Sequence, residues 1–142
     1  MMNIKSIKPA QGPQALGPYS IGMVHGPTLY LSAILPTDSN QEISTEDIKQ
    51  QTIQVIDNIE SLLEAYDLDL SHVLKTQVSV TDIDDYALIN QVFAIYFAHP
   101  YPARSLVEVQ RLPKGAKIQI ECTVAFGDSI VEEVTDYCES CD

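Results

Sequence analysis

Apolar residues recur along this chain with two spacings, one typical of helices and one typical of strands. Between Ile48 and Tyr66 they lie three or four residues apart, which predicts an amphipathic helix of about five turns with one buried face. Ser44, with Asp47 three residues further on, is predicted to form the N-terminal cap of this helix.

A second helix is predicted after Thr81 or Asp82, since either side chain can cap a helix N-terminus. It ends before Pro100 and Pro102, because proline cannot continue a helix. The side chains expected on its apolar stripe are Ile83, Tyr86, Ala87, Asn90, Phe93, Ala94 and Phe97.

Two segments alternate between apolar and polar residues, which predicts strands with one buried face. In 72–80 the face expected to be buried consists of Leu74, Thr76, Val78 and Val80. In 117–126 it consists of Ile118, Ile120, Cys122, Val124 and Phe126. Gln119 belongs to the opposite face of that last strand.

Three further strands complete the prediction. Segments 19–24 and 28–35 are expected to form a hairpin around His25-Gly26-Pro27, and 104–109 is expected to be a strand. The order of elements indicates an α+β or split α/β sandwich with one sheet. Two helices can cover only one face of such a sheet, so the other face should meet a ligand or another subunit.

Charge separates the chain into two unequal parts. With 142 residues it fits a single domain, which we assign to residues 1–127. The formal charge is −12, and residues 128–142 contain six acidic and no basic residues, which predicts a solvated tail outside the core. The acidic balance argues against nucleic-acid binding. No apolar run suits a membrane span or a signal peptide, so a cytoplasmic protein without membrane contact is expected.

The tail carries a C-x-x-C pair, Cys138 and Cys141. Such a pair can be a redox couple or half of a zinc site, but no second ligand pair occurs in the sequence and its histidines are scattered singly. An incidental pair is the favoured interpretation. The residues therefore give no reason to expect a metal.

Arg104 is the candidate for ligand chemistry, and Arg111, in a loop beside Pro113, is the only other arginine. Arg104 directly follows Pro102-Ala103, and the proline restricts the local backbone. A rigidly held guanidinium can bind both oxygens of a small carboxylate. A surface ion pair with one of the many acidic residues is the alternative.

Several stretches occur in the order and spacing of a known family. They are Gly17-Pro18-Tyr19-Ser20, Ser32 leading to Pro36, Lys75-Thr76-Gln77-Val78 with Asp82, Asn90, residues 102–109 (PARSLVEV) and residues 111–114 (RLPK). On these motifs the sequence resembles the RidA (YjgF) family of reactive-intermediate deaminases from about residue 3 to residue 126.

The resemblance implies a chorismate-mutase-like fold and a homotrimeric barrel with a ligand cleft between neighbouring subunits. It also implies hydrolysis of imines and enamines such as 2-aminoacrylate to 2-keto acids and ammonia, without a cofactor. Arg104 would bind the substrate carboxylate, Tyr19 would close the cleft, and Ser32 and Ala33 would line it. Asn90 would have a structural or supporting role rather than bind the substrate itself.

This sequence departs from the family pattern at several positions. Ala33 stands where glycine is expected, Ile34 where glutamine is usual, and Leu106 where the family has cysteine. Gln119 replaces the glutamate that positions or activates water on the last strand. A carboxylate can accept a proton from attacking water, while an amide can only orient it.

Two hypotheses from different classes follow. The first is a homotrimeric imine deaminase, a hydrolase of the 2-iminobutanoate/2-iminopropanoate type, with Arg104 and Gln119 as its catalytic pair and activity weakened by Gln119. The second is a trimeric module that binds small keto acids or related metabolites for regulation without turnover. Ribonuclease or translation-inhibitor activity, an older label of the family, is the weakest alternative because the chain is acidic.

Overall fold

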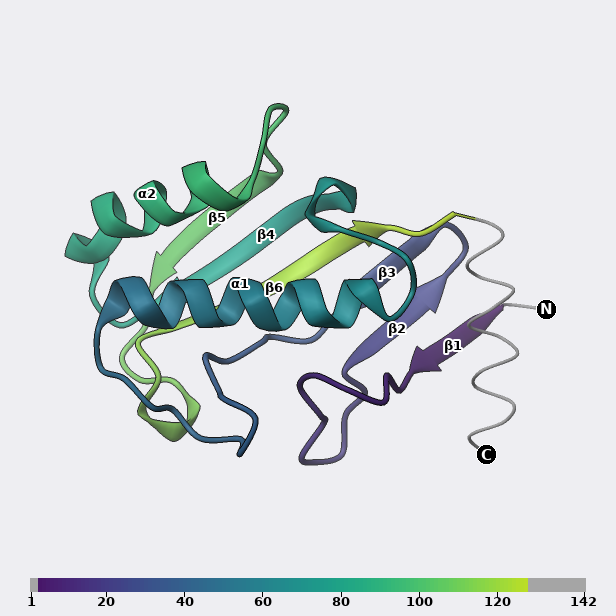
Figure 1. Cartoon of the computed structure of the whole chain (residues 1–142), viewed down its shortest axis with the longest axis horizontal. Helices are drawn as coiled ribbons and strands as arrows, with labels where there is room; N and C mark the ends of the chain where they lie inside the picture. The colour runs from purple at the N-terminus through teal and green to yellow at the C-terminus, as the bar shows by residue number, and fades with distance from the viewer. Residues whose placement is uncertain (1–2, 128–142) are drawn as a thin grey trace.

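A mixed sheet is the framework of the computed structural model, which describes residues 3–127 (Figure 1). Its six strands lie in the order β1-β2-β3-β6-β4-β5. The β4–β5 pair is parallel, and every other neighbouring pair is antiparallel. The strand bounds are Ile4–Ile7 for β1, Gly22–His25 for β2, Thr28–Leu31 for β3, Val73–Val80 for β4, Ala103–Glu108 for β5 and Ile118–Ala125 for β6.

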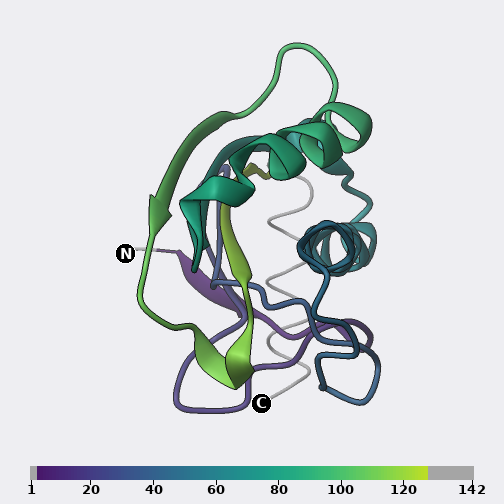
Figure 2. The same ribbon diagram turned by 90° about the vertical axis from the view of Figure 1, so that its left-hand side faces the viewer.

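Both helices lie on the same face of this sheet (Figure 2). Helix α1 spans Ile48–Glu64 and crosses the middle of the sheet, and α2 spans Tyr86–Tyr96 and lies beside β4 and β5 (Figure 1). Three short 3₁₀ turns, Leu70–His72, Ile83–Asp85 and Pro113–Gly115, connect the elements. The α+β prediction with one covered face is confirmed.

The core fills the space between the helices and the sheet. Strand β6 alternates as predicted, with Ile118, Ile120, Cys122 and Val124 buried and Gln119 on the opposite face. The buried side of α1 consists of Ile48, Gln51, Thr52, Val55, Ile56, Ile59, Leu62 and Leu63. Burying an aliphatic side chain of this size stabilises the fold by about 1.5–3 kcal/mol, so these residues hold the sheet and the helix together.

A buried glutamine links α1 to the beginning of β6. Gln51 is 1% exposed, and its Nε2 donates to the backbone oxygen of Thr45 at 2.8 Å. Its Oε1 accepts from the backbone N–H of Lys117 at 2.8 Å. A buried polar side chain is tolerated when its groups are paired in this way.

The cap of α1 differs from the prediction. Asp47 is itself the N-cap, and its side chain accepts from the backbone N–H of Lys49. Thr45 Oγ1 in turn accepts from the backbone N–H of Asp47. Asp47 replaces Ser44 in this role because the helix begins at Ile48, so the residue directly before it meets the free N–H groups.

The buried face predicted for the second helix is wrong at the N-terminal end of that helix. Asp82 caps the 3₁₀ turn Ile83–Asp85, and α2 then buries Ile89, Val92 and Phe93. Ile83 and Tyr86 are 42% and 49% exposed. The helix therefore carries two neighbouring apolar stripes, and only one of them packs into the core.

Leu74 was predicted on the buried face of its strand but lies on the opposite face, where it is 53% exposed. The pairing of β4 with β6 shifts by one residue between Val73 and Lys75. Because one extra residue in a strand reverses the side on which its neighbours point, Val73 takes the core position instead. Thr76, Val78 and Val80 are buried as predicted.

The N-terminal part of the sheet differs from the expected hairpin. Strands β2 and β3 are shorter than 19–24 and 28–35, and the turn consists of Gly26-Pro27 while His25 pairs with Thr28. Residues Tyr19 and Ser32 therefore lie outside the strands. Strand β1, Ile4–Ile7, was not predicted, and it pairs with β2 along the sheet edge.

The face of the sheet away from the helices is mixed in character. Met23, Tyr30 and Val107 are exposed there at 36%, 52% and 53%, next to polar residues such as Lys75 and Thr123. No helix within 3–127 is long and apolar enough to cross a membrane. The predicted acidic tail, with Cys138 and Cys141, lies outside the described residues.

Candidate functional site

Arg104 is the second residue of β5 and lies between that strand and α2. It pairs in parallel register with the buried Thr76, so its side chain projects from the face that carries the helices. Its Cζ atom lies 5.1 Å from the ring centre of Phe93 and 5.4 Å from that of Tyr86. Ring faces attract a guanidinium, so the two aromatic residues hold it in place.

The guanidinium of Arg104 has no hydrogen-bonding or ion-pair partner among residues 3–127. The surface ion pair that sequence reasoning considered is therefore not formed within this part of the chain. An arginine offers five N–H donors in a planar fork that matches a carboxylate. These donors are available to a ligand.

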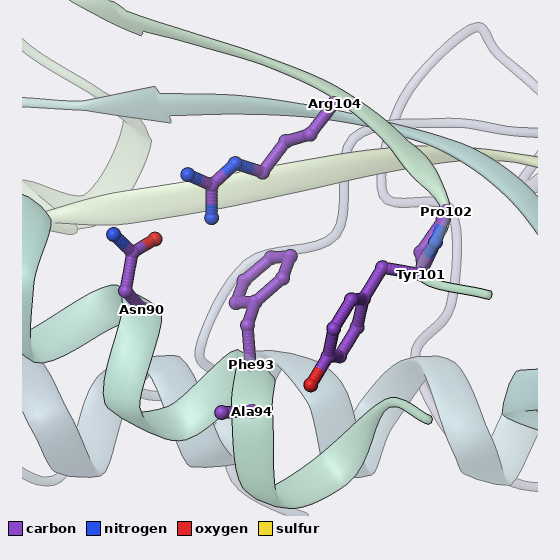
Figure 3. A pocket seen from close by; sticks show the side chains of 6 residues that line it. All are labelled: Asn90, Phe93, Ala94, Tyr101, Pro102 and Arg104. Carbon is purple, nitrogen blue, oxygen red and sulfur yellow. The ribbon is translucent and has the colours of Figure 1, made fainter. Parts of the chain in front are cut away.

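A pocket of about 320 Å³ opens beside this guanidinium (Figure 3). Its lining consists of Asn90, Phe93, Ala94, Tyr101, Pro102 and Arg104. Asn90 and Phe93 come from α2, and Tyr101 comes from the loop before β5 (Figure 3). The pocket thus combines one cation, one amide and the phenol of Tyr101 with an otherwise apolar wall, which suits a small organic acid.

Three of the predicted binding residues lie in a separate region. The Tyr19 hydroxyl accepts from the backbone N–H of Leu16 at 3.3 Å, and Tyr19 is 52% exposed. Ser32 Oγ donates to the backbone oxygen of Ser20 at 2.6 Å. Tyr19 and Ala33 line a smaller pocket of about 40 Å³, whose lining does not include Arg104.

Gln119 lies on the opposite side of the sheet from Arg104. Ile118 and Ile120 on either side of it are buried toward the helices, and Gln119 pairs with Ser79 on the outer face. The bridge between Ile34 and Ile120 places the segment after Ala33 alongside Gln119. The predicted residues thus form two groups, Arg104 with Asn90, and Gln119 with the segment that contains Ser32 and Ala33.

Sequence reasoning did not identify the aromatic surroundings of Arg104. The apolar pattern places Tyr86 and Phe93 on a helix stripe and does not single out Tyr101. The available signal was Asn90, a polar residue in the middle of that apolar stripe. A polar residue at such a position indicates that the stripe faces a site rather than the core.

Cys122 is unsuited to nucleophilic chemistry. It is 3% exposed and lies next to Thr76 in the β4–β6 register. Burial, together with the nearby charge of Glu121, raises the pKa of its thiol to about 12. Since the thiolate is the reactive form, this side chain acts as an apolar core residue. Within 3–127 no three His, Cys, Asp or Glu side chains gather in a way that could hold a metal ion.

Comparison with known proteins finds consistent likeness over this domain. Residues 9–126 match the family model described as Endoribonuclease L-PSP. The chain is 39% identical over 124 residues to the RutC family protein y4sK of Sinorhizobium fredii, covering 87% of this chain and 98% of that protein. It is 37% identical over 120 residues to the 2-iminobutanoate/2-iminopropanoate deaminase of Salmonella typhimurium, covering 82% and 94%.

The fold is likewise similar to a solved structure, RidA from the Antarctic bacterium Psychrobacter sp. PAMC 21119. The TM-score is 0.81 at 38% identity, with 86% of this chain and 99% of that chain covered. The match extends over both helices and the sheet that position the two groups of candidate residues.

Proposed function

Since this chain belongs to the RidA/YjgF family, we propose that it hydrolyses imines and enamines of 2-keto acids to the keto acid and ammonia. The observation that carries the proposal is the guanidinium of Arg104, which has no partner within 3–127 and lies beside a pocket with a mostly apolar lining. A charge-assisted bond to a carboxylate would fix the substrate there. The name of the Salmonella relative supports this reaction type.

In the proposed reaction, the substrate carboxylate binds the Arg104 fork and a water molecule attacks C2 of the imine. The C2–oxygen bond forms while one proton of the water passes to the imine nitrogen, which gives a carbinolamine. The carbinolamine hydroxyl then loses its proton to the nitrogen as the C2–nitrogen bond breaks, so that ammonia leaves and the keto group of the acid forms. Gln119 would orient the attacking water through its amide. An amide is a weaker partner than a carboxylate because it cannot accept the proton, so slow turnover is expected.

We further propose that the active site forms between two copies of the chain within a homotrimer. Arg104 and Gln119 lie on opposite faces of one sheet, so a single chain cannot present both to one substrate. A neighbour could supply Gln119, Tyr19, Ser32 and Ala33 to the pocket beside Arg104. The apolar residues on the uncovered face, including Tyr30 and Val107, support association of the subunits.

Mixed oligomers test both parts of this proposal. Arg104→Ala removes the guanidinium that would bind the substrate carboxylate. Ala33→Trp places a large side chain in the other group of candidate residues, which contains Ser32 and Gln119. If one site uses Arg104 of one chain and Ala33 of its neighbour, random mixing in equal amounts leaves about a quarter of the sites free of both changes. Ammonia release should therefore reappear in the refolded mixture although each variant alone is inactive. Absence of activity in a mixture that native mass spectrometry shows to contain mixed trimers contradicts the shared site.

A binding module without turnover is the second candidate, and Gln119 is the observation that favours it. Both hypotheses use the same carboxylate pocket. Only the enzyme hypothesis expects the protein to accelerate the release of ammonia from imines, which an amino-acid oxidase can generate in solution. Binding of keto acids without any acceleration of imine hydrolysis over the uncatalysed rate would select the binding module.

Ribonuclease activity, which the description of the family model suggests, is not proposed. Residues 1–127 hold 14 acidic and 8 basic residues. Binding to a phosphate backbone depends on clustered lysine and arginine.

A further inference from the structure

We infer that Asn58, on helix α1, is a positioning residue for one of the two groups of candidate residues. That group contains Ser32, Ala33 and Gln119, and Asn58 fixes it by holding the segment 32–37 against β6. The inference rests on the proposed function for its effect on turnover, and on the structure alone for its effect on the segment. All the contacts that carry it are within one chain, so no residue of a neighbour is needed to form them.

An isolated bridge joins the segment 32–37 to β6. The N–H of Ile34 donates to the backbone oxygen of Ile120 at 2.8 Å, and the N–H of Ile120 donates to the oxygen of Ile34 at 3.1 Å. Pro36 follows two residues later and has no N–H with which the pairing could continue. The bridge therefore depends on what holds the chain after it.

Asn58 holds the chain directly after the bridge. Its Nδ2 donates to the backbone oxygen of Leu35 at 3.0 Å and to that of Thr37 at 2.9 Å. These two residues flank Pro36. The Oδ1 of Asn58 accepts from Nε2 of Gln54, one turn earlier on α1, at 2.9 Å. Both N–H donors of the amide and its acceptor are thus in use, which fixes the orientation of the side chain.

The choice of asparagine is not explained by the helix itself. Asn58 lies in the interior of α1, next to the buried Ile59, and it is half-buried. Asparagine is one of the less favourable residues in a helix interior, because its amide competes for backbone groups. An aspartate of the same size has no donor, and a serine has only one. The two carbonyls across from the helix therefore account for this residue.

The backbone transmits this hold to the candidate group. Ile34 lies between Ala33 and Leu35, and its bridge partner Ile120 directly follows Gln119. Without the hold on Leu35 the bridge can open, and the spacing between Ala33 and Gln119 is then no longer fixed. A displacement of about 1 Å in a reacting group can slow a reaction about a hundredfold.

Amide hydrogen exchange, measured by NMR on the full chain, tests the hold on the segment without any substrate. Asn58→Asp keeps the volume but turns an acceptor toward the two carbonyl oxygens where two donors were. The amides of Ile34 and Ile120 should then exchange about tenfold faster or more. The amide of Val109, which donates to the oxygen of Val80 at 2.7 Å elsewhere in the fold, should keep its rate.

Turnover of 2-iminopropionate tests the consequence for the reaction. The kcat of Asn58→Asp should fall about ten- to a hundredfold. Titration with 2-oxobutanoate should show the wild-type number of binding sites and an affinity within about threefold of the wild type, because the proposed contact of the carboxylate with Arg104 is untouched. The control is Gln50→Glu, the same change from amide to carboxylate at an exposed position of α1, and it should leave exchange and turnover unchanged.

Unchanged exchange at Ile34 and Ile120 overturns the inference, and so does equal acceleration at Val109, which would show a general loss of stability. A normal kcat despite faster exchange at the bridge overturns it, as does a fall in kcat that a loss of binding sites explains. If the wild-type protein does not accelerate imine hydrolysis, the deaminase proposal fails, while faster exchange confined to the bridge still supports the hold by Asn58. If Asn58→Asp does not fold, Asn58→Ala is measured in the same way, since it removes the donors without adding a charge.

Discussion

The Cζ atom of Arg104 lies 5.4 Å from the centre of the Tyr86 ring, so an aromatic face from the beginning of α2 supports a cation on β5. Phe93 supports the same guanidinium from a position further along the helix. The pair explains how Arg104 keeps a fixed orientation although no carboxylate within 3–127 binds it.

Tyr86→Leu should weaken the binding of 2-oxobutanoate about two- to fivefold, because one cation–π contact at an exposed site contributes about 0.5–1 kcal/mol. Tyr86→Phe keeps the ring and should bind as the wild type does. Both affinities can be measured by calorimetry. Since Tyr86 is half-exposed, the melting temperature should stay unchanged. If Tyr86→Phe bound 2-oxobutanoate as weakly as Tyr86→Leu, the hydroxyl and not the ring would support the site.

Arg104→Lys should weaken keto-acid binding tenfold or more although it keeps the charge. Lysine is a point charge, while the guanidinium fork matches both carboxylate oxygens, and one charge-assisted hydrogen bond contributes about 1.5–3 kcal/mol. The measurement is a titration with 2-oxobutanoate. Arg111→Lys, at an exposed position outside this pocket, is the matched control and should bind normally. Equal affinity of Arg104→Lys and wild type would place the ligand elsewhere.

Gln119→Glu should raise kcat for 2-iminopropionate and leave KM equal or higher. The added carboxylate can accept a proton from water, an assistance typically worth about 10²–10⁴-fold, but it also repels the substrate carboxylate. The side chains are nearly equal in volume and Gln119 is on the outer face, so the fold should tolerate the change. Equal rates for variant and native protein would show that another group activates the water.

Cys122 should make the protein less stable as the pH rises above the usual pKa of a thiol, 9.0. Its pKa in the folded state is about 12, so between these values the unfolded chain loses a proton that the folded chain retains. The free energy of unfolding then falls with increasing pH, by about 1.4 kcal/mol per pH unit for one such group.

Urea denaturation between about pH 8 and pH 11 checks this expectation, because the range spans the ordinary titration of a thiol. The comparison is Cys122→Ala, with Cys138→Ser and Cys141→Ser present in both proteins. The difference in unfolding free energy between the protein that keeps Cys122 and the Cys122→Ala variant should shrink as the pH rises. A constant difference would mean that the buried thiol does not titrate differently on unfolding.

Much of the fold could be predicted from the sequence because its main elements bury one face each. The periodicity of α1 and of β6 identifies their buried sides, since each packs against a single apolar surface. Strand β1 was not predicted because it is a four-residue edge strand with Lys5 in its middle, and backbone pairing with β2 rather than side-chain burial defines it. Leu74 was misplaced because a register shift leaves no trace in the alternation itself.

The candidate site was only partly predictable for a different reason. The motif at residues 102–109, which contains Arg104, and the position of Asn90 in the family pattern identified one wall of the pocket. The alternation of residues does not indicate that Arg104 and Gln119 lie on opposite faces, because that depends on how β5 and β6 each pair with β4. The aromatic partners Tyr86 and Phe93 depend on how α2 is rotated over the sheet, which its two apolar stripes left ambiguous.

The position of β6 has a consequence for how the chain folds. Among residues 3–127 the last strand, β6, is inserted between β3 and β4, and it alone joins the β1–β2–β3 meander to the β4–β5 pair. During synthesis the meander and the helices therefore emerge before the strand that joins the two parts of the sheet. Both parts keep an unpaired edge until residues 118–125 arrive, and these distant pairings are slow to form. The sheet can therefore be completed only after residues 118–125 have been synthesised.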